Sequence, residues 1–229
     1  MRYNEHMGSL IEDRGLRDKQ FVFEDRDDAG KRLASVLEAY GGTNTIVLAI
    51  PSGGVPIGAR IAQDLSLPFD LLIVRKLQIP FNTEAGFGAM TLSGEVLLNS
   101  ELVASLGLAR DVINATISAT QDILERRNDL FRKGRPTPDC RDMSVIITDD
   151  GLASGYTMRA AVRWVKGMRP KRIVVAVPTG SEWTVRALQQ EVDELVCLNV
   201  RGGQRFAVAE AYRNWHDLSD DEVLRITAG

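Results

Sequence analysis

The chain is poor in the residues that mark several common classes of protein. It has two cysteines, Cys140 and Cys197, and two histidines in 229 residues. The cysteines have neither metal-ligand spacing nor a secretory context, which fits a reducing cytoplasm. Apolar runs stay well below the ~20 residues that a membrane span needs, and the N-terminus lacks the apolar core of a signal peptide. We therefore expect a cytoplasmic protein with no membrane partner.

The chain also has no strong excess of positive or negative charge. The formal net charge is -3, which argues against a dedicated nucleic-acid binder. One local basic cluster lies between Arg126 and Arg141, and we interpret it as a solvated helix end with the loop that follows. A hydrophobic content of 44% supports a sizeable core. The length suits one α/β domain with a small appended lobe.

Apolar periodicity alternates between strand and helix along the chain. The pattern predicts strands at 45–50, 69–74, 145–148, 172–177 and 194–199, and helices at 27–40, 57–65, 111–132, 158–168 and 185–192. Such alternation implies right-handed βαβ units, so the expected fold class is α/β with a Rossmann-like parallel sheet flanked by helices. Residues 1–19 are polar and aperiodic, and we expect a mobile arm there. Residues 82–95 are rich in glycine and small residues, and we expect a functional or mobile loop.

The stretch from Val145 to Thr157 carries the most chemical information. A buried β-branched run ends at Asp149 and Asp150, whose carboxylates can accept hydrogen bonds from vicinal ribose hydroxyls. A loop of small residues then enters a helix whose first amides are unpaired and whose dipole favours an anion. The residues that we assign to a phosphate are Ala153, Ser154, Gly155, Tyr156 and Thr157. The alternative is a simple turn, because Asp and Gly both tolerate bent backbones.

Two further candidate segments follow predicted strands. Ser52, Gly53 and Gly54 come after the first strand, and adjacent glycines let the backbone amides approach a pyrophosphate closely. Arg75 and Lys76 close the second strand, where two cations are suited to neutralise a departing diphosphate. The alternatives are a Pro/Gly turn and a solvated charge pair. Ligands of parallel sheets bind beyond the carboxyl ends of the strands, where both segments are expected.

A third candidate segment follows the strand after the predicted phosphate-binding helix; it would face a second ligand, the acceptor, and is called the acceptor side below. Pro178 and Thr179 are candidates for contacts with a planar base in a strand-end loop, whereas Trp183 is interpreted as a packing residue. Trp215 and His216, near the C-terminus, are candidates for a hood over the acceptor. A lone histidine beside an aromatic residue is more often a surface or core residue, so His216 receives no catalytic role.

The Val145–Thr157 stretch resembles the 5-phosphoribosyl-1-pyrophosphate (PRPP) signature of type I phosphoribosyltransferases. That signature runs as apolar strand, acidic pair, two variable residues, small residue, Thr or Ser, Gly, any residue, Thr. Residues 74–89, with Arg-Lys, a Pro-Asn-x-Glu turn and a Gly-Ala strand, are similar to an uncharacterised group of the same family. The resemblance covers 21 to about 226. It implies a phosphoribosyltransferase domain over 20–229, with a small hood from its N- and C-terminal parts.

The resemblance also implies an activity: transfer of the 5-phosphoribosyl group of PRPP to a nitrogenous acceptor, such as a nucleobase, with release of pyrophosphate. Mg²⁺ would be bound mainly through PRPP, with no direct protein ligand, and Asp149, Asp150, Arg75 and Lys76 are the candidate catalytic residues. A cis peptide is expected before Ser52, a position where relatives usually carry Arg or Lys. A homodimer is the usual expectation.

The residue at position 153 bears on the acceptor. Ala153 stands where hypoxanthine-guanine phosphoribosyltransferases usually carry an Asp that exchanges a proton with the purine. The resemblance therefore implies that 6-oxopurines are not the main acceptors, whereas adenine and uracil stay in play.

Two other function classes stay open. A PRPP- or nucleotide-binding regulator on the same fold would bind the sugar phosphate without turnover, and the basic cluster from Arg126 to Arg141 is the sequence feature that favours it. Hydrolysis or phosphorolysis of nucleotides would need a positioned water and a general base, which the sequence does not identify. Turnover of PRPP with a panel of bases separates these classes.

Overall fold

The main element of the fold is a six-stranded sheet. The computed structural model describes residues 7–80, 82–203 and 205–228. The strand order is β1-β9-β8-β7-β2-β3, and every neighbouring pair is parallel. The strands are β1 (Ser9–Ile11), β2 (Thr45–Ala49), β3 (Phe69–Leu71), β7 (Ser144–Thr148), β8 (Arg172–Ser181) and β9 (Glu194–Arg201). The predicted α/β fold with a parallel sheet is confirmed.

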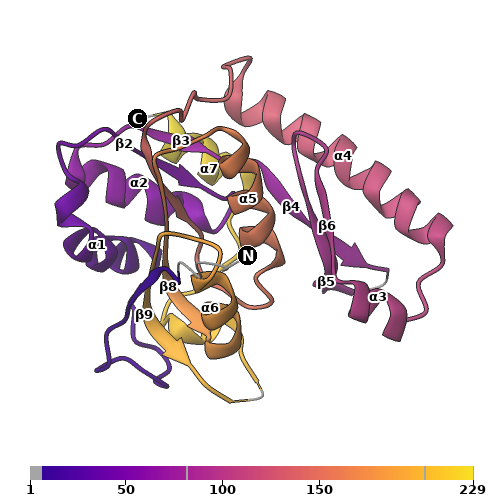
Figure 1. The fold of residues 1–229 in the computed structure, drawn as a ribbon, viewed down its shortest axis with the longest axis horizontal. Helices are drawn as coiled ribbons and strands as arrows, with labels where there is room; N and C mark the ends of the chain where they lie inside the picture. Colours follow the sequence, from indigo (N-terminus) through magenta and orange to yellow (C-terminus); the bar gives the residue numbers. More distant parts are fainter. Residues whose placement is uncertain (1–6, 81, 204, 229) are drawn as a thin grey trace, which may run out of the picture.

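Helices cover both faces of this sheet (Figure 1). On one face lie α1 (Arg26–Val36) and α2 (Gly54–Leu65), and on the other lie α5 (Tyr156–Gly167) and α6 (Glu182–Gln189). Successive side chains of a strand point to opposite faces. In β7, Ile146 therefore packs with α1 and α2, while Ile147 packs with α5 and α6. This two-sided burial explains the uninterrupted apolar run in the sequence.

A second, antiparallel sheet lies beside the main one. It has the order β4-β5-β6, from β4 (Val74–Ile79), β5 (Asn82–Thr91) and β6 (Val96–Leu98). With α3 (Ser100–Ser105) and the long α4 (Arg110–Arg132) it forms a lobe at one side of the molecule (Figure 1). Leu124 and Phe131 of α4 join Leu77 and Phe87 of the small sheet in one apolar cluster.

The small sheet corrects two expectations. The predicted strand over 69–74 is wrong as a single element, because β3 ends at Leu71 and β4 starts a different sheet at Val74. The loop expected over 82–95 is also wrong: most of it is β5, which pairs with β4 and β6. Its glycines serve close strand contact, since a Cβ at Gly88 would lie 2.4 Å from the carbonyl oxygen of Leu97.

The N-terminal part of the described chain packs onto the main sheet. Strand β1 adds to the edge of the sheet beside β9, and Asn199 Nδ2 donates to the carbonyl of Leu16 at 2.6 Å. Residues 9–11 of the arm expected over 1–19 thus pair with the main sheet, while residues 1–6 lie outside the described residues.

The remaining elements are the 3-10 helices η1 (Glu38–Tyr40) and η2 (Val208–Ala211) and the C-terminal helix α7 (Asp220–Thr227). Ser219 and Glu222 form a capping box at the start of α7, which packs on α2 and α4. Along the described part of the chain, no helix combines the length and the apolar character needed to cross a membrane.

Candidate functional site

The acidic pair lies where β7 ends, at the carboxyl edge of the sheet. Asp150 Oδ2 accepts hydrogen bonds from Nε and Nη2 of Arg26 at 3.1 and 3.0 Å. The Asp150 amide donates to Asp149 Oδ1 at 2.9 Å. A Cβ at Gly53 would lie 1.9 Å from Asp150 Oδ2, so glycine at this position lets the two loops meet. The acidic pair is thus held against both α1 and the loop that precedes α2.

Arg26 is the counterion of this pair. Its side chain is 7% exposed, and its guanidinium lies 3.9 Å from the centroid of the Trp215 ring. Its Nη1 donates to the carbonyl of His216 at 3.0 Å. Burial, followed by the charge of Asp150, raises the pKa of Asp149 well above its usual range, and Arg26 opposes this shift. Arg26 therefore favours the ionised form of both carboxyls, against the effect of burial.

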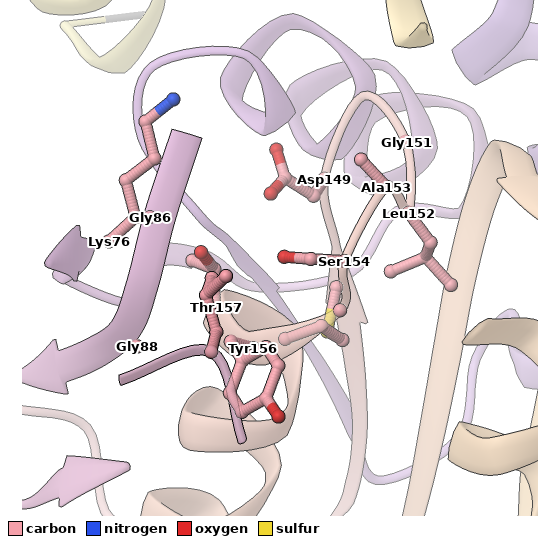
Figure 2. A pocket seen from close by; sticks show the side chains of 13 residues that line it. Lys76, Gly86, Gly88, Asp149, Gly151, Leu152, Ala153, Ser154, Tyr156 and Thr157 are labelled. Atoms are coloured by element: carbon pink, nitrogen blue, oxygen red, sulfur yellow. The ribbon is translucent and has the colours of Figure 1, made fainter. Parts of the chain in front are cut away.

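The predicted phosphate loop lines a cavity of about 360 Å³. Among the described residues, the backbone amides of 153–157 have no hydrogen-bond acceptor, as expected at the start of a helix. Gly155, with φ of +78°, is the N-cap of α5. Figure 2 shows the Ser154 and Thr157 side chains around the same hollow as Asp149, with Lys76 on its opposite side. The loop therefore offers amides, hydroxyls and helix dipole to one ligand.

A second cavity, of about 560 Å³, adjoins the first and shares Lys76, Asp149 and Thr157 with it. Ser52 and Gly53 line this cavity, and the peptide between Pro51 and Ser52 is cis, which confirms the expectation. Gly54 does not line it. Its amide donates to the carbonyl of Ile50 at 3.0 Å, and a Cβ there would lie 2.6 Å from the carbonyl oxygen of Thr148, so its role is close packing.

Arg75 and Lys76 both line the second cavity, but not as the end of a parallel strand. They lie within β4 of the antiparallel sheet, paired with Met90 and Ala89 of β5. The prediction that they end a strand of the parallel sheet is therefore wrong. The prediction that they lie near the acidic pair agrees with the structure, because both residues line the cavity that Asp149 and Asp150 line. Burial, followed by the charge of Arg127, lowers the pKa of Arg75. The small lobe thus supplies cations to the main sheet's edge.

The predicted acceptor side needs correction. Strand β8 continues to Ser181, so Pro178 and Thr179 lie inside a strand instead of a loop, and both are buried. Thr179 Oγ1 donates to Asn199 Oδ1 at 2.7 Å. Trp183, expected to pack, is 78% exposed and lines a third cavity, which also contains Ala153 and Ser154. Trp215 lines the second cavity, while His216 faces Glu222 with Nε2 2.9 Å from Oε1.

Two cations of the site, Arg26 and Arg127, were not predicted from the sequence. Arg127 was placed in a solvated cluster, yet its side chain is 16% exposed and lines the second cavity. The helical spacing could have indicated its burial, because Arg127 lies three residues after Leu124 and four before Phe131, on the same face of the helix, and both of those residues are buried. Arg132 of the same cluster is also buried and pairs with Asp70 at 2.8 Å. The solvated interpretation is wrong for both.

The parallel sheet, the acidic pair and the amide loop at its carboxyl edge define a phosphoribosyl transferase domain. The sequence family described as "Phosphoribosyl transferase domain" matches residues 25–211, and the chain belongs to this family. It is 37% identical over 203 residues to "Putative phosphoribosyl transferase Rv0571c" of Mycobacterium tuberculosis, covering 89% of this chain. The aligned region is 46% of that relative, so the chain spans about half the length of the curated relatives it matches.

Solved structures agree with this fold. The crystal structure of TT1426 from Thermus thermophilus is similar with a TM-score of 0.71 and 32% identity, covering 90% of this chain and 97% of that one. AQ2163 from Aquifex aeolicus has a TM-score of 0.50 at 12% identity, covering 82% of this chain and 78% of its own, which shows the fold alone.

Proposed function

We propose that this protein is a phosphoribosyltransferase that transfers the 5-phosphoribosyl group of PRPP to a nitrogenous acceptor and releases pyrophosphate. The observation that carries the proposal is the pair of adjoining cavities at one sheet edge. One is lined by the amide loop 153–157, the other by Ser52, Gly53 and a set of cations, and Asp149 lines both. PRPP has the same order of groups: a 5′-phosphate, a ribose diol and a diphosphate.

Each wall then has a role. The amides of 153–157 bind the 5′-phosphate. Asp149 and Asp150 accept hydrogen bonds from the ribose hydroxyls, and Arg75 and Lys76 stabilise the diphosphate as it leaves. The transition state of this chemistry is oxocarbenium-like, so the site orients the sugar and shields it from water and needs no protein nucleophile.

Mg²⁺ fits this arrangement as a partner of PRPP. The described residues hold no group of three or more His, Cys, Asp or Glu side chains placed to bind a metal by themselves. The carboxylates of Asp149 and Asp150 are oxygen donors of the kind that Mg²⁺ prefers, and they would meet it through water. When bound, Mg²⁺ neutralises charge on the diphosphate. Asp149 and Asp150 would orient the ribose relative to the diphosphate.

The acceptor is assigned only as a nitrogenous base. Its recognition is proposed to involve the third cavity, where the exposed Trp183 ring offers a face for stacking. This cavity shares Ala153 and Ser154 with the phosphate loop, so an acceptor there would lie beside the sugar phosphate.

The test is turnover. Purified protein with PRPP and Mg²⁺ is offered purines, pyrimidines and small amines, and pyrophosphate release is measured, with the D149N/D150N variant as the control for contaminating activity. We expect pyrophosphate release that depends on one class of acceptor and is lost in the variant. PRPP binding without release for any acceptor would contradict turnover and leave a regulator on the same fold.

A further inference from the structure

The pyrophosphate loop of this chain lacks a cation of its own. Relatives of the type that the sequence resembles usually carry Arg or Lys at position 52, where this chain has Ser52. In the structure Nη2 of Arg127 donates to Ser52 Oγ at 2.8 Å. Arg127 belongs to α4, 75 residues further along the chain. A guanidinium therefore reaches the loop from another element.

Arg127 is held in place from two sides. Its Nη2 also donates to Asp220 Oδ1 at 2.9 Å, and Asp220 is the first residue of α7, next to the capping box. Its guanidinium carbon lies 5.4 Å from the centroid of the Phe131 ring. These bonds use the two hydrogens of Nη2. Nη1 and Nε have no partner among the residues that the structure describes, which leaves three N–H groups for a ligand.

The cavity is lined by the cations Arg26, Arg75, Lys76 and Arg127 and by the carboxylates of Asp149, Asp150 and Asp217, and Arg26 is paired with Asp150. Arg75, Lys76 and Arg127 line it together, and the charge of Arg127 contributes to the lowered pKa of Arg75. Asp220, whose side chain is 46% exposed, is the acidic partner of Arg127. Clustering cations in a partly buried space costs free energy through mutual repulsion. A bound diphosphate would remove that cost.

We propose that Arg127 is a further pyrophosphate-binding cation of this site beside Arg75 and Lys76, supplied by α4 in place of the basic residue that relatives carry at the position of Ser52. This inference rests on the proposed function and adds a binding residue to it. The competing explanation is a purely structural bridge, in which Arg127 only ties α4 to α7 through Asp220.

Two variants separate these explanations, because both break the Arg127–Asp220 ion pair but only one removes the cation. R127Q removes the cation, whereas D220N breaks the same ion pair from the other side and keeps the cation. R126Q is the charge-matched control, since Arg126 is the exposed neighbour on α4. Affinities for pyrophosphate and for ribose 5-phosphate, both with Mg²⁺, are measured by calorimetry, and thermal unfolding confirms that each variant is folded.

We expect R127Q to bind pyrophosphate roughly tenfold or more weakly than wild type, since a hydrogen bond to a charged group is lost. Its affinity for ribose 5-phosphate should stay within about twofold, because the 5′-phosphate lies on the other loop. D220N and R126Q should keep most of the pyrophosphate affinity. An added arginine in S52R/R127Q should restore part of what R127Q loses, because it returns the charge to the loop.

Three results would count against the role of Arg127, and they have different meanings. If wild type binds pyrophosphate and ribose 5-phosphate and R127Q binds pyrophosphate equally well, the role of Arg127 is refuted and the proposed function stands. An equal loss in R127Q and D220N would also refute it, in favour of the structural bridge. If wild type binds neither ligand, the proposed function fails and the role of Arg127 fails with it.

Discussion

Arg26 is the buried cation beside the acidic pair, and its loss should be costly to the stability of the protein. The side chain is 7% exposed and pairs with Asp150, whose side chain is 16% exposed. Replacing Arg26 with Met keeps an apolar side chain against Trp215 but leaves Asp149 and Asp150 as adjacent carboxylates without their cation. Breaking a buried ion pair from one side costs about 3–5 kcal/mol. For a domain of this size that lowers Tm by roughly 6–20 °C.

The control is R32M on the same helix. Arg32 is 45% exposed and pairs with Asp28 one turn away, an arrangement worth at most about 0.5 kcal/mol. The double variant R26M/D150N removes one unpaired charge, so it should be more stable than R26M alone. Free energies of unfolding come from urea titrations of the four proteins, including wild type.

The loss in R26M should also depend on pH. Burial raises the pKa of Asp149 and of Asp150 above their usual values, and Arg26 opposes both shifts. These two carboxyls bind protons more readily in the folded protein than in the unfolded chain, and more so without Arg26. Their contribution to stability is therefore present below the unfolded pKa values and is lost as pH rises through the folded pKa values. R26M should therefore lose more stability at pH 8 than at pH 5. Equal losses in R26M and R32M, or no dependence on pH, would refute this account of the acidic pair.

Three further predictions concern the loop, the acceptor and Asp149. G155A should cost about 1–3 kcal/mol and weaken ribose 5-phosphate binding, because φ is +78° and its Cβ would lie 2.4 Å from Thr184 Cγ2; G167A, which meets nothing within 4 Å, is the control in thermal melts and calorimetry. Hypoxanthine and guanine should be turned over less efficiently than the best acceptor, because Ala153 cannot exchange a proton with the purine; comparable kcat/KM values would contradict this. D149N should be more stable relative to wild type at pH 8 than at pH 5, since it removes a carboxyl whose pKa burial raises; urea titrations showing a constant difference would count against it.

The parallel sheet could be predicted because each of its strands is a local signal. Buried β-branched runs such as 145–148 are followed by small residues and a helical period, and that pattern survives in the structure. The small sheet could not be predicted in the same way. Residues 82–91 owe their strand conformation to pairing with β4 and β6. Their glycines are typical of a loop, and the sequence alone does not reveal the two strands with which they pair.

The residues of the candidate site also divide into those that are close in the sequence, which could be predicted, and those that are distant in it, which could not. Asp149, Asp150 and the loop 153–157 belong to one contiguous stretch, so their proximity follows from the sequence. Arg26 and Arg127 reach the site from residues 124 and 75 positions away in the chain, and no local period shows such a pairing. The burial of Thr179 was missed because strand β8 runs past Pro178, a residue that usually ends regular pairing.

The central claim is that Asp149 and Asp150 bind the ribose of PRPP. Calorimetry of PRPP with Mg²⁺ against wild type and D149N/D150N tests it most directly, with thermal unfolding to show that the variant is folded at the temperature used. Each carboxylate loses charge-assisted hydrogen bonds worth ~1.5–3 kcal/mol, so the account predicts that PRPP affinity falls by roughly tenfold or more. Unchanged PRPP affinity in the folded variant would contradict it, because the acidic pair would then be only a turn.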